Sequence, residues 1–188
     1  LSRDFFWIYR NFDYVYGTPD FKYYEVAPIL QYNKNSLEGV PYGETHNFDL
    51  TKTIKVPAGA ESTHLRTIIT GWGHATPLEN GRGCAEWCFR KHNIWINNAQ
   101  KFEHDLKAEN CAANPINDQR GNWQGNRAGW CPGVMVPVRI DYFNNSVAGT
   151  DLNFEYKFTE WTNNMQSGAD NLHAYYSLSN LVVVTSNS

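Results

Sequence analysis

Apolar residues occupy every second position in several stretches of this chain. Between 152 and 158, apolar side chains alternate with Asn153, Glu155 and Lys157, and between 134 and 140 four aliphatic residues follow the same spacing. A period of two puts successive side chains on opposite faces of a strand, so each stretch predicts a β-strand with one buried face. Further strands are expected at 48–56, 65–70, 94–96 and 181–185.

The way these strands follow one another narrows the fold class. Turn signals rich in Gly, Pro and Asn separate them, and no segment has the periodicity of a convincing amphipathic helix. Successive strands without intervening helices favour an antiparallel β-sandwich, and we expect its jelly-roll form. The loop-rich stretch 71–133 contains all four cysteines and five of the seven tryptophans, so we expect long, disulfide-stapled loops and a site there.

Length and charge set limits on domains and partners. The 188 residues are enough for one substantial core, which we assign to 21–188. Residues 1–20 are interpreted as an extra N-terminal strand or the remnant of a preceding domain. A net charge of -3 with mixed signs argues against nucleic acid or an anionic membrane as partner. No apolar stretch approaches the roughly 20 residues that span a bilayer.

The four cysteines predict two disulfides, for which three pairings exist. Pairing Cys84 with Cys88 and Cys111 with Cys131 closes the shortest loops, which would contribute roughly 2 and roughly 3 kcal/mol to stability. A zinc site is the competing interpretation, but Cys111 and Cys131 lack the short ligand spacing of structural zinc sites. Disulfides place the protein in an oxidising compartment, either secreted or periplasmic.

Glu86 is the candidate catalytic residue. It lies between Cys84 and Cys88, and a bridge between these two would keep its side chain from wandering. Trp87 beside it could shield the carboxylate from water, a condition for general acid or base work. The alternative is an exposed glutamate in a surface loop.

Arg127, Trp130 and Trp72 are candidates for substrate binding. The Arg127 guanidinium could pair with a carboxylate or donate to sugar hydroxyls, although a structural salt bridge is equally consistent with the sequence. Trp130 offers a face for a sugar ring. Glycines flank Trp72 and would let a ligand come close. Aromatic side chains in such polar loops favour a carbohydrate or peptide partner.

Metal, cofactor and serine-nucleophile chemistry find no support in the sequence. The histidines at 64, 74, 92 and 104 show neither an H-x-H pair nor a helical i, i+4 pair. We therefore predict no metal site and no cofactor. A G-x-S-x-G nucleophile elbow is also absent from the sequence.

Five short motifs together carry a family resemblance. They are T-G-W-G-H at 70–74, C-A-E-W-C at 84–88, N-P at 114–115, G-N-W at 121–123 and R-A-G-W-C-P-G at 127–133. With these motifs the chain resembles the peptide-N-glycosidase F family, specifically its C-terminal jelly-roll domain. The match is densest over about a third of the chain.

The resemblance implies an amidohydrolase that removes asparagine-linked glycans and converts the asparagine to aspartate. It implies two eight-stranded jelly rolls side by side, with the active site in the cleft between them. Glu86 would be the acidic active-site residue of the C-terminal domain. Arg127, Trp130, Trp72 and Trp87 would contact the chitobiose core. The resemblance also supports the neighbour pairing of the cysteines and a bacterial source.

The same resemblance limits what this chain would do alone. The family's principal catalytic aspartate lies on the N-terminal jelly roll, of which we expect little or nothing here. Hydrolysis would then need a second jelly roll packed against this one, and the isolated chain would be inactive. The alternative is a non-catalytic N-glycan-binding module. A third alternative, from fold analogy alone, is a copper monooxygenase with paired jelly rolls. Such an enzyme needs clustered His and Met ligands, and the two methionines and scattered histidines of this chain argue against it.

Overall fold

The computed structural model describes residues 17–32, 40–41, 51–79, 82–116, 119–144, 147–158 and 175–187. At 32, 40–41, 74–79, 82, 84 and 158 the description covers the backbone alone. Most of the N-terminal segment assigned above to 1–20 therefore lies outside the described residues. Within the described ranges, no helix has the length and apolar character needed to cross a membrane.

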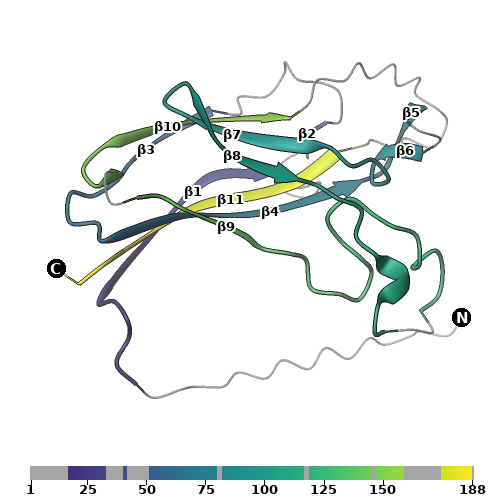
Figure 1. The fold of residues 1–188 in the computed structure, drawn as a ribbon, viewed down its shortest axis with the longest axis horizontal. Coiled ribbons are helices and arrows are strands. Elements are labelled where there is room, and N and C mark those ends of the chain that lie inside the picture. The colour runs from purple at the N-terminus through teal and green to yellow at the C-terminus, as the bar shows by residue number, and fades with distance from the viewer. Residues whose placement is uncertain are drawn as a thin grey trace, which may run out of the picture.

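The strands form two main antiparallel sheets and a small hairpin sheet (Figure 1). The first sheet has the order β1-β11-β4-β9, with β2 also paired to β11, and the second has the order β3-β10-β7-β8. β5 pairs with β6 in the hairpin sheet. The bounds are β1 Tyr23–Tyr32, β2 Val40–Pro41, β3 Thr51–Lys55, β4 Ser62–Trp72, β5 His74–Glu79, β6 Arg82–Ala85, β7 Lys91–Ile96, β8 Ala99–Asp105, the 3₁₀ turn η1 Cys111–Ala113, β9 Arg139–Tyr142, β10 Asp151–Phe158 and β11 Tyr175–Ser186.

The core lies between the two main sheets, as the alternation predicts. In β4 and β11 every second side chain is buried, and these inward positions face buried residues of β7 and β10. Burial of such aliphatic and aromatic side chains contributes roughly 1.5–3 kcal/mol each. The predicted antiparallel β-sandwich is confirmed. Its innermost members are Leu65, Ile69, Ile94, Ile96, Leu152, Phe154, Tyr156, Leu178 and Val182.

Most of the predicted strands are present. β10 covers 151–158, β7 contains 94–96, β4 contains 65–70 and β11 contains 181–185. Within the predicted strand 48–56, β3 forms an exposed edge of the second sheet at Thr51–Lys55, and Val56 follows it into the core. The first part of that prediction, 48–50, lies outside the described residues.

The predicted strand at 134–140 is wrong over most of its length. Only Arg139–Tyr142 forms a strand, and Val134 and Ile140 are 42% and 41% exposed. Pro137 has no N–H to donate to a ladder, which disfavours a strand through that point. In β9 it is the polar residues Arg139 and Asp141 that face the second sheet, because their cross-strand partners are the buried Thr67 and Leu65.

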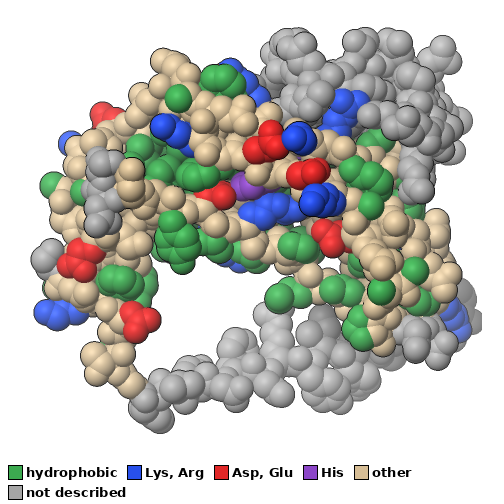
Figure 2. Space-filling view, in the orientation of Figure 1, with side chains coloured by type: hydrophobic (Ala, Val, Ile, Leu, Met, Phe, Trp, Pro, Cys, Tyr) green, Lys and Arg blue, Asp and Glu red, His purple; other side chains and the backbone are tan. Residues whose placement is uncertain are grey.

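A polar cluster therefore closes the sandwich between β8 and β9. Asp141 Oδ2 lies 2.6 Å from Nε2 of the buried His104, and this pair joins the two sheets. His92, directly opposite His104 on β7, is fully buried and hydrogen-bonded through Nδ1 to the Tyr156 hydroxyl at 2.5 Å. Burial, reinforced by the charge of Arg139, lowers the pKa of His92 to about 3. Figure 2 shows acidic, basic and histidine side chains gathered along this side of the molecule.

Candidate active site

Three segments meet where β4 ends. The Glu86 N–H donates to Gly73 O at 3.1 Å, the Ala128 N–H donates to Glu86 O at 2.8 Å, and the Gly71 N–H donates to Ala128 O at 3.0 Å. A Cβ atom at Gly71 would collide with the carbonyl of Ala85, so this close approach requires glycine. The backbone thus brings the C-A-E-W-C and R-A-G-W-C-P-G motifs to the same end of the sandwich.

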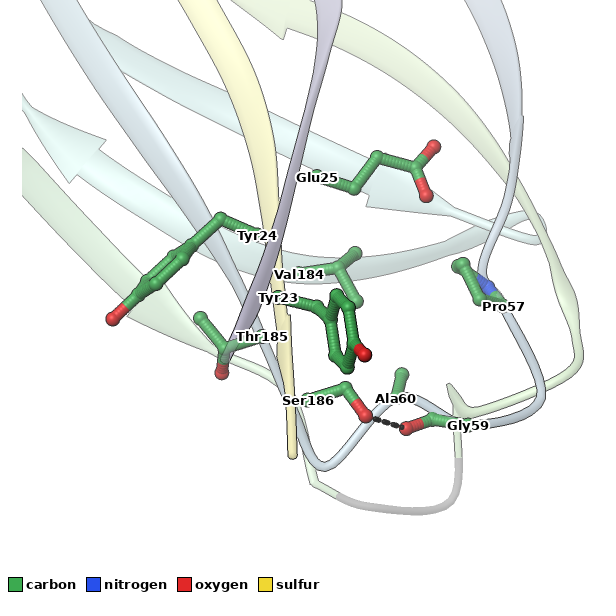
Figure 3. A pocket seen from close by; sticks show the side chains of 9 residues that line it. All are labelled: Tyr23, Tyr24, Glu25, Pro57, Gly59, Ala60, Val184, Thr185 and Ser186. Carbon is green, nitrogen blue, oxygen red and sulfur yellow. Dashed lines mark hydrogen bonds between the residues drawn. The ribbon is translucent and has the colours of Figure 1, made fainter. Parts of the chain in front are cut away.

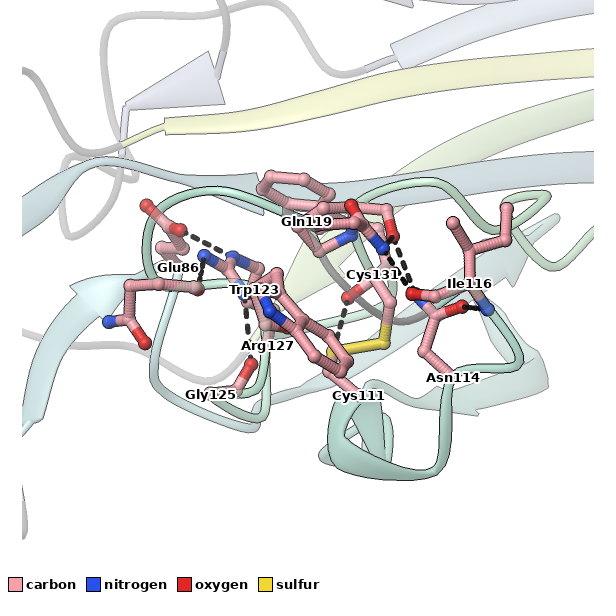
Figure 4. The surroundings of a disulfide bond; sticks show 12 residues. Glu86, Cys111, Asn114, Ile116, Gln119, Trp123, Gly125, Arg127 and Cys131 are labelled. Carbon is pink, nitrogen blue, oxygen red and sulfur yellow. Dashed lines mark hydrogen bonds and ion pairs between the residues drawn. A yellow bond between two sulfur atoms is a disulfide. The ribbon is translucent and has the colours of Figure 1, made fainter.

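Glu86 and Arg127 form a largely buried ion pair. Arg127 Nε donates to Glu86 Oε1 at 2.8 Å, and the side chains are 7% and 14% exposed, respectively. The remaining guanidinium nitrogens donate to backbone carbonyls, Gly125 O at 2.9 Å and Asn122 O at 2.5 Å (Figure 4). Since each of its three nitrogens donates within the protein, Arg127 is arranged to orient Glu86 and the 122–125 loop.

Indole rings surround this ion pair. The Arg127 guanidinium carbon lies 4.6 Å from the centroid of the Trp87 ring and 5.0 Å from that of Trp130. Trp72 stacks on Trp130 with centroids 4.0 Å apart and planes 23° apart. Trp130 is thus packed between Trp72 and Arg127. All three tryptophans are half-buried, so part of each residue is open to solvent.

Both indole N–H groups of the stacked pair are used within the protein. Trp130 Nε1 donates to Gly71 O at 2.8 Å, and Trp72 Nε1 donates to Thr70 Oγ1 at 2.7 Å. These bonds fix the orientation of the rings on the end of β4. A ligand would therefore meet a preformed aromatic surface, which lowers the entropy lost on binding.

A disulfide holds the loop that carries Arg127 and Trp130. Cys111 and Cys131 are bridged, with their Cα atoms 5.3 Å apart, which confirms that predicted pairing. Asn114 Nδ2 donates to Pro132 O at 2.7 Å and Gln119 Nε2 donates to the same oxygen at 3.1 Å. Cys88 is also disulfide-bonded. The side chain of Cys84 lies outside the described residues, so the pairing of Cys84 with Cys88 stays a prediction.

The structure adds one residue to the site that the sequence did not nominate. Tyr175 begins β11 directly opposite Trp72 and is half-buried. Partial burial and the negative charge of Glu86 raise the pKa of the Tyr175 hydroxyl. No local signal could have found it, because Tyr175 reaches Glu86 only through the pairing of β11 with β4.

The chemistry available here is that of a fixed carboxylate beside aromatic rings. In the described part of the chain, no group of three or more His, Cys, Asp or Glu side chains could hold a metal ion. A carboxylate held by a guanidinium can accept hydrogen bonds from a bound molecule at a defined position. Half-exposed indoles beside it provide flat apolar surface, such as the C–H face of a sugar ring requires.

The fold and the site together define an antiparallel β-sandwich protein with a carboxylate site in the loops at one end. In that site a buried Glu–Arg pair lies among indole rings. Residues 42–182 match the family model described as peptide-N-glycosidase F, C terminal. The chain is 55% identical over 180 residues to peptide-N(4)-(N-acetyl-beta-D-glucosaminyl)asparagine amidase F of Elizabethkingia miricola, which covers 95% of this chain and 50% of the relative. The chain therefore belongs to the peptide-N-glycosidase F family, as its motifs suggested.

Solved structures agree with this assignment. PNGase F of Flavobacterium meningosepticum, described as a glycosylasparaginase, superposes with a TM-score of 0.83 at 55% identity, over 93% of this chain and 55% of that one. PNGF-II superposes with a TM-score of 0.62 at 15% identity, over 87% of this chain and 30% of that one, which shows a shared fold alone. The predicted jelly-roll sandwich is confirmed. The chain spans about half the length of the two enzymes to which it is 55% identical.

Proposed function

We propose that this chain supplies the C-terminal half of the active site of a peptide-N4-(N-acetyl-β-glucosaminyl)asparagine amidase. In that reaction water cleaves the bond between the asparagine side-chain carbonyl and the glycan nitrogen, leaving aspartate and a glycosylamine. The observation that carries the proposal is the Glu86–Arg127 pair, held among indoles in a chain 55% identical to such an amidase. The substrate is an N-glycosylated protein or glycopeptide.

Each site residue has a role that follows from its contacts. Glu86 acts by charge and hydrogen bonding at the scissile amide, because Arg127 holds its carboxylate in one orientation. Arg127 is a positioning residue, since each of its three nitrogens donates to Glu86 or to a backbone carbonyl. Trp72 and Trp87 pack against the N-acetylglucosamine rings next to the asparagine. Trp130, whose faces are covered by Trp72 and Arg127, supports the Trp72 ring and meets the sugar through its edge.

A second jelly-roll domain completes the cleft. The relatives are about twice as long as this chain, which supports a further domain packed against this one. The Cys111–Cys131 bridge supports an oxidising compartment, and we propose that the protein is secreted or periplasmic in a bacterium.

The test is glycan release from a denatured N-glycoprotein, followed by the mass of the released glycan and the Asn-to-Asp change on the peptide. We expect release when the chain is joined to the N-terminal half of the Elizabethkingia relative, and strong loss of release in Glu86→Gln of the same fusion. Binding of N-glycan core by the chain, without release by the fusion, would instead identify a glycan-binding module. Unchanged turnover in Glu86→Gln would remove Glu86 from the mechanism.

A further inference from the structure

Tyr175 lies on the outer face of the first sheet, beside the indoles of the site. Residues directly opposite each other in an antiparallel pair share a face, and Tyr175 is opposite Trp72. The next residue, Tyr176, is 1% exposed and packs edge-on against His92 with ring centroids 4.5 Å apart. Because side chains alternate along a strand, Tyr175 must point the other way, out of the core.

The same position brings Tyr175 close to the carboxylate. The Glu86 N–H donates to the carbonyl of Gly73, which directly follows Trp72, the last residue of β4. The negative charge of Glu86, together with partial burial, raises the pKa of the Tyr175 phenol. A tyrosine phenol is protonated at neutral pH, and this shift keeps it so, which leaves an O–H that can donate to a ligand.

The composition of this face suits a sugar. A half-buried tyrosine offers an apolar ring and one polar donor at its tip. Its cross-strand neighbour on the same face is Trp72, the ring that stacks on Trp130. Sugar rings need both an apolar surface under their C–H face and hydrogen-bond partners for their hydroxyl and N-acetyl oxygens. Tyr175 can supply both at the edge of the indole pair.

We propose that Tyr175 is a further substrate-contacting residue, whose ring extends the Trp72–Trp130 surface and whose hydroxyl donates to an N-acetylglucosamine ring held beside Glu86. This inference rests on the proposed function, because it uses the same ligand. It gives the C-terminal half a specific polar contact with the sugar in addition to aromatic stacking.

The experiment is a titration of the chain with N,N′-diacetylchitobiose, followed by NMR shifts of the backbone amide and indole N–H signals. Tyr175→Phe keeps the ring and removes the hydroxyl, and we expect roughly five-fold weaker binding, the effect of one lost hydrogen bond. Tyr175→Ala removes the ring as well and should bind more weakly still. Tyr142→Phe is the matched control, because Tyr142 is 69% exposed on β9 of the same sheet and contacts His64 instead. Its binding should equal that of the unsubstituted chain.

The possible outcomes separate this inference from the proposed function. If the unsubstituted chain gives no shifts, or if Tyr175→Phe and Tyr142→Phe both bind like the unsubstituted chain, Tyr175 is not a substrate contact. Glycan release is measured in parallel on the fusion carrying Glu86→Gln or Tyr175→Phe. Loss of release in Glu86→Gln with unchanged release and binding in Tyr175→Phe would remove Tyr175 and leave the proposed function standing. Weaker chitobiose binding in Tyr175→Phe with no release by any fusion would keep Tyr175 as a sugar contact and remove the amidase.

Discussion

The two ends of the sandwich carry similar residue types in different arrangements. Strand β11 begins at Tyr175, beside Glu86 and the indoles, and ends at Ser186, beside a shallow hollow of about 360 Å³. Figure 3 shows this second end, with Tyr23, Tyr24 and Glu25 around the hollow. Both ends therefore combine aromatic rings with a carboxylate.

The difference lies in how the side chains are held. At the first end, Glu86 is fixed by Arg127, and the loop behind it is closed by a disulfide. At the second end, Tyr23 and Tyr24 are 59% and 58% exposed. Aromatic rings and a carboxylate do not by themselves make a site. The first end is a better candidate because its polar groups are buried, oriented and cross-linked before any ligand arrives.

The largest expected effect comes from removing the cation of the first end. In Arg127→Ala, Glu86 would be left as a buried carboxylate without its guanidinium, and Asn122 O and Gly125 O would lose their donor. We expect the free energy of unfolding to fall by about 3 kcal/mol, as measured by urea denaturation.

The matching change at the second end is Tyr24→Ala, at an exposed side chain, which should change stability by less than about 0.5 kcal/mol. Equal effects of Arg127→Ala and Tyr24→Ala would contradict the distinction between the two ends.

Opening the disulfide should give a loss of similar size. The double variant Cys111→Ser with Cys131→Ser frees the loop that presents Arg127 and Trp130, and the chain-entropy model gives about 3 kcal/mol for a loop of this size. Asn114 and Gln119 still bond Pro132 O, so part of the loop order should remain. Thermal unfolding of the oxidised protein and the double variant measures this, and an unchanged Tm would contradict it.

The stability of the fold should fall in acid because of the buried His92, which lies between the two ends. The pKa of His92 is about 3 in the folded chain, against an ordinary value of 6.5, so the unfolded state binds a proton first as the pH falls. The contribution of His92 to the free energy of unfolding is complete above pH ~6.5 and is lost as the pH falls towards ~3. At pH ~5 the loss should be about 2 kcal/mol.

Urea denaturation at pH ~7.5 and pH ~5 measures this loss, and the pH window follows from the same linkage. His92→Gln should reduce the difference in unfolding free energy between the two pH values by that amount. A variant with the same difference as the unsubstituted chain would show that His92 is protonated in the fold.

The smallest effect concerns the phenol at the first end. Replacing Glu86 by glutamine removes a negative charge that raises the pKa of Tyr175, so that pKa should fall, while partial burial keeps it above the ordinary value. NMR titration of ring-labelled tyrosine measures the change. Glu25→Gln, which neutralises a carboxylate at the other end, should leave the Tyr175 titration unchanged. Identical titration curves for Glu86→Gln and the unsubstituted chain would show that the charge of Glu86 does not act on the Tyr175 phenol.

The strands of the sandwich were predictable where the alternation of apolar residues matches the face that is buried in the structure. β10 was predicted because Leu152, Phe154 and Tyr156 all face the core of one sandwich. The prediction failed at 134–138, where aliphatic spacing continues through a proline-containing segment outside the sheets. Alternation alone does not say which face is buried, and in β9 the polar face turned inward to pair Asp141 with His104.

The site was predictable in its parts and not in its geometry. The motifs nominated Glu86, Arg127 and the indoles, but Glu86 and Arg127 are 41 residues apart, and only the meeting of their loops at the end of β4 pairs them. Sequence left open whether Arg127 would bind sugar or a carboxylate. Its burial and its backbone acceptors favour the second role.

The most direct test of the account is to locate the sugar on the molecule. Chemical-shift mapping of N,N′-diacetylchitobiose on the isotope-labelled chain would compare both ends in one experiment. The account predicts shifts of the Trp72 and Trp130 indole N–H signals and of Tyr175, and none at Tyr23 and Tyr24. Shifts confined to Tyr23 and Tyr24, with the indole signals unchanged, would contradict it.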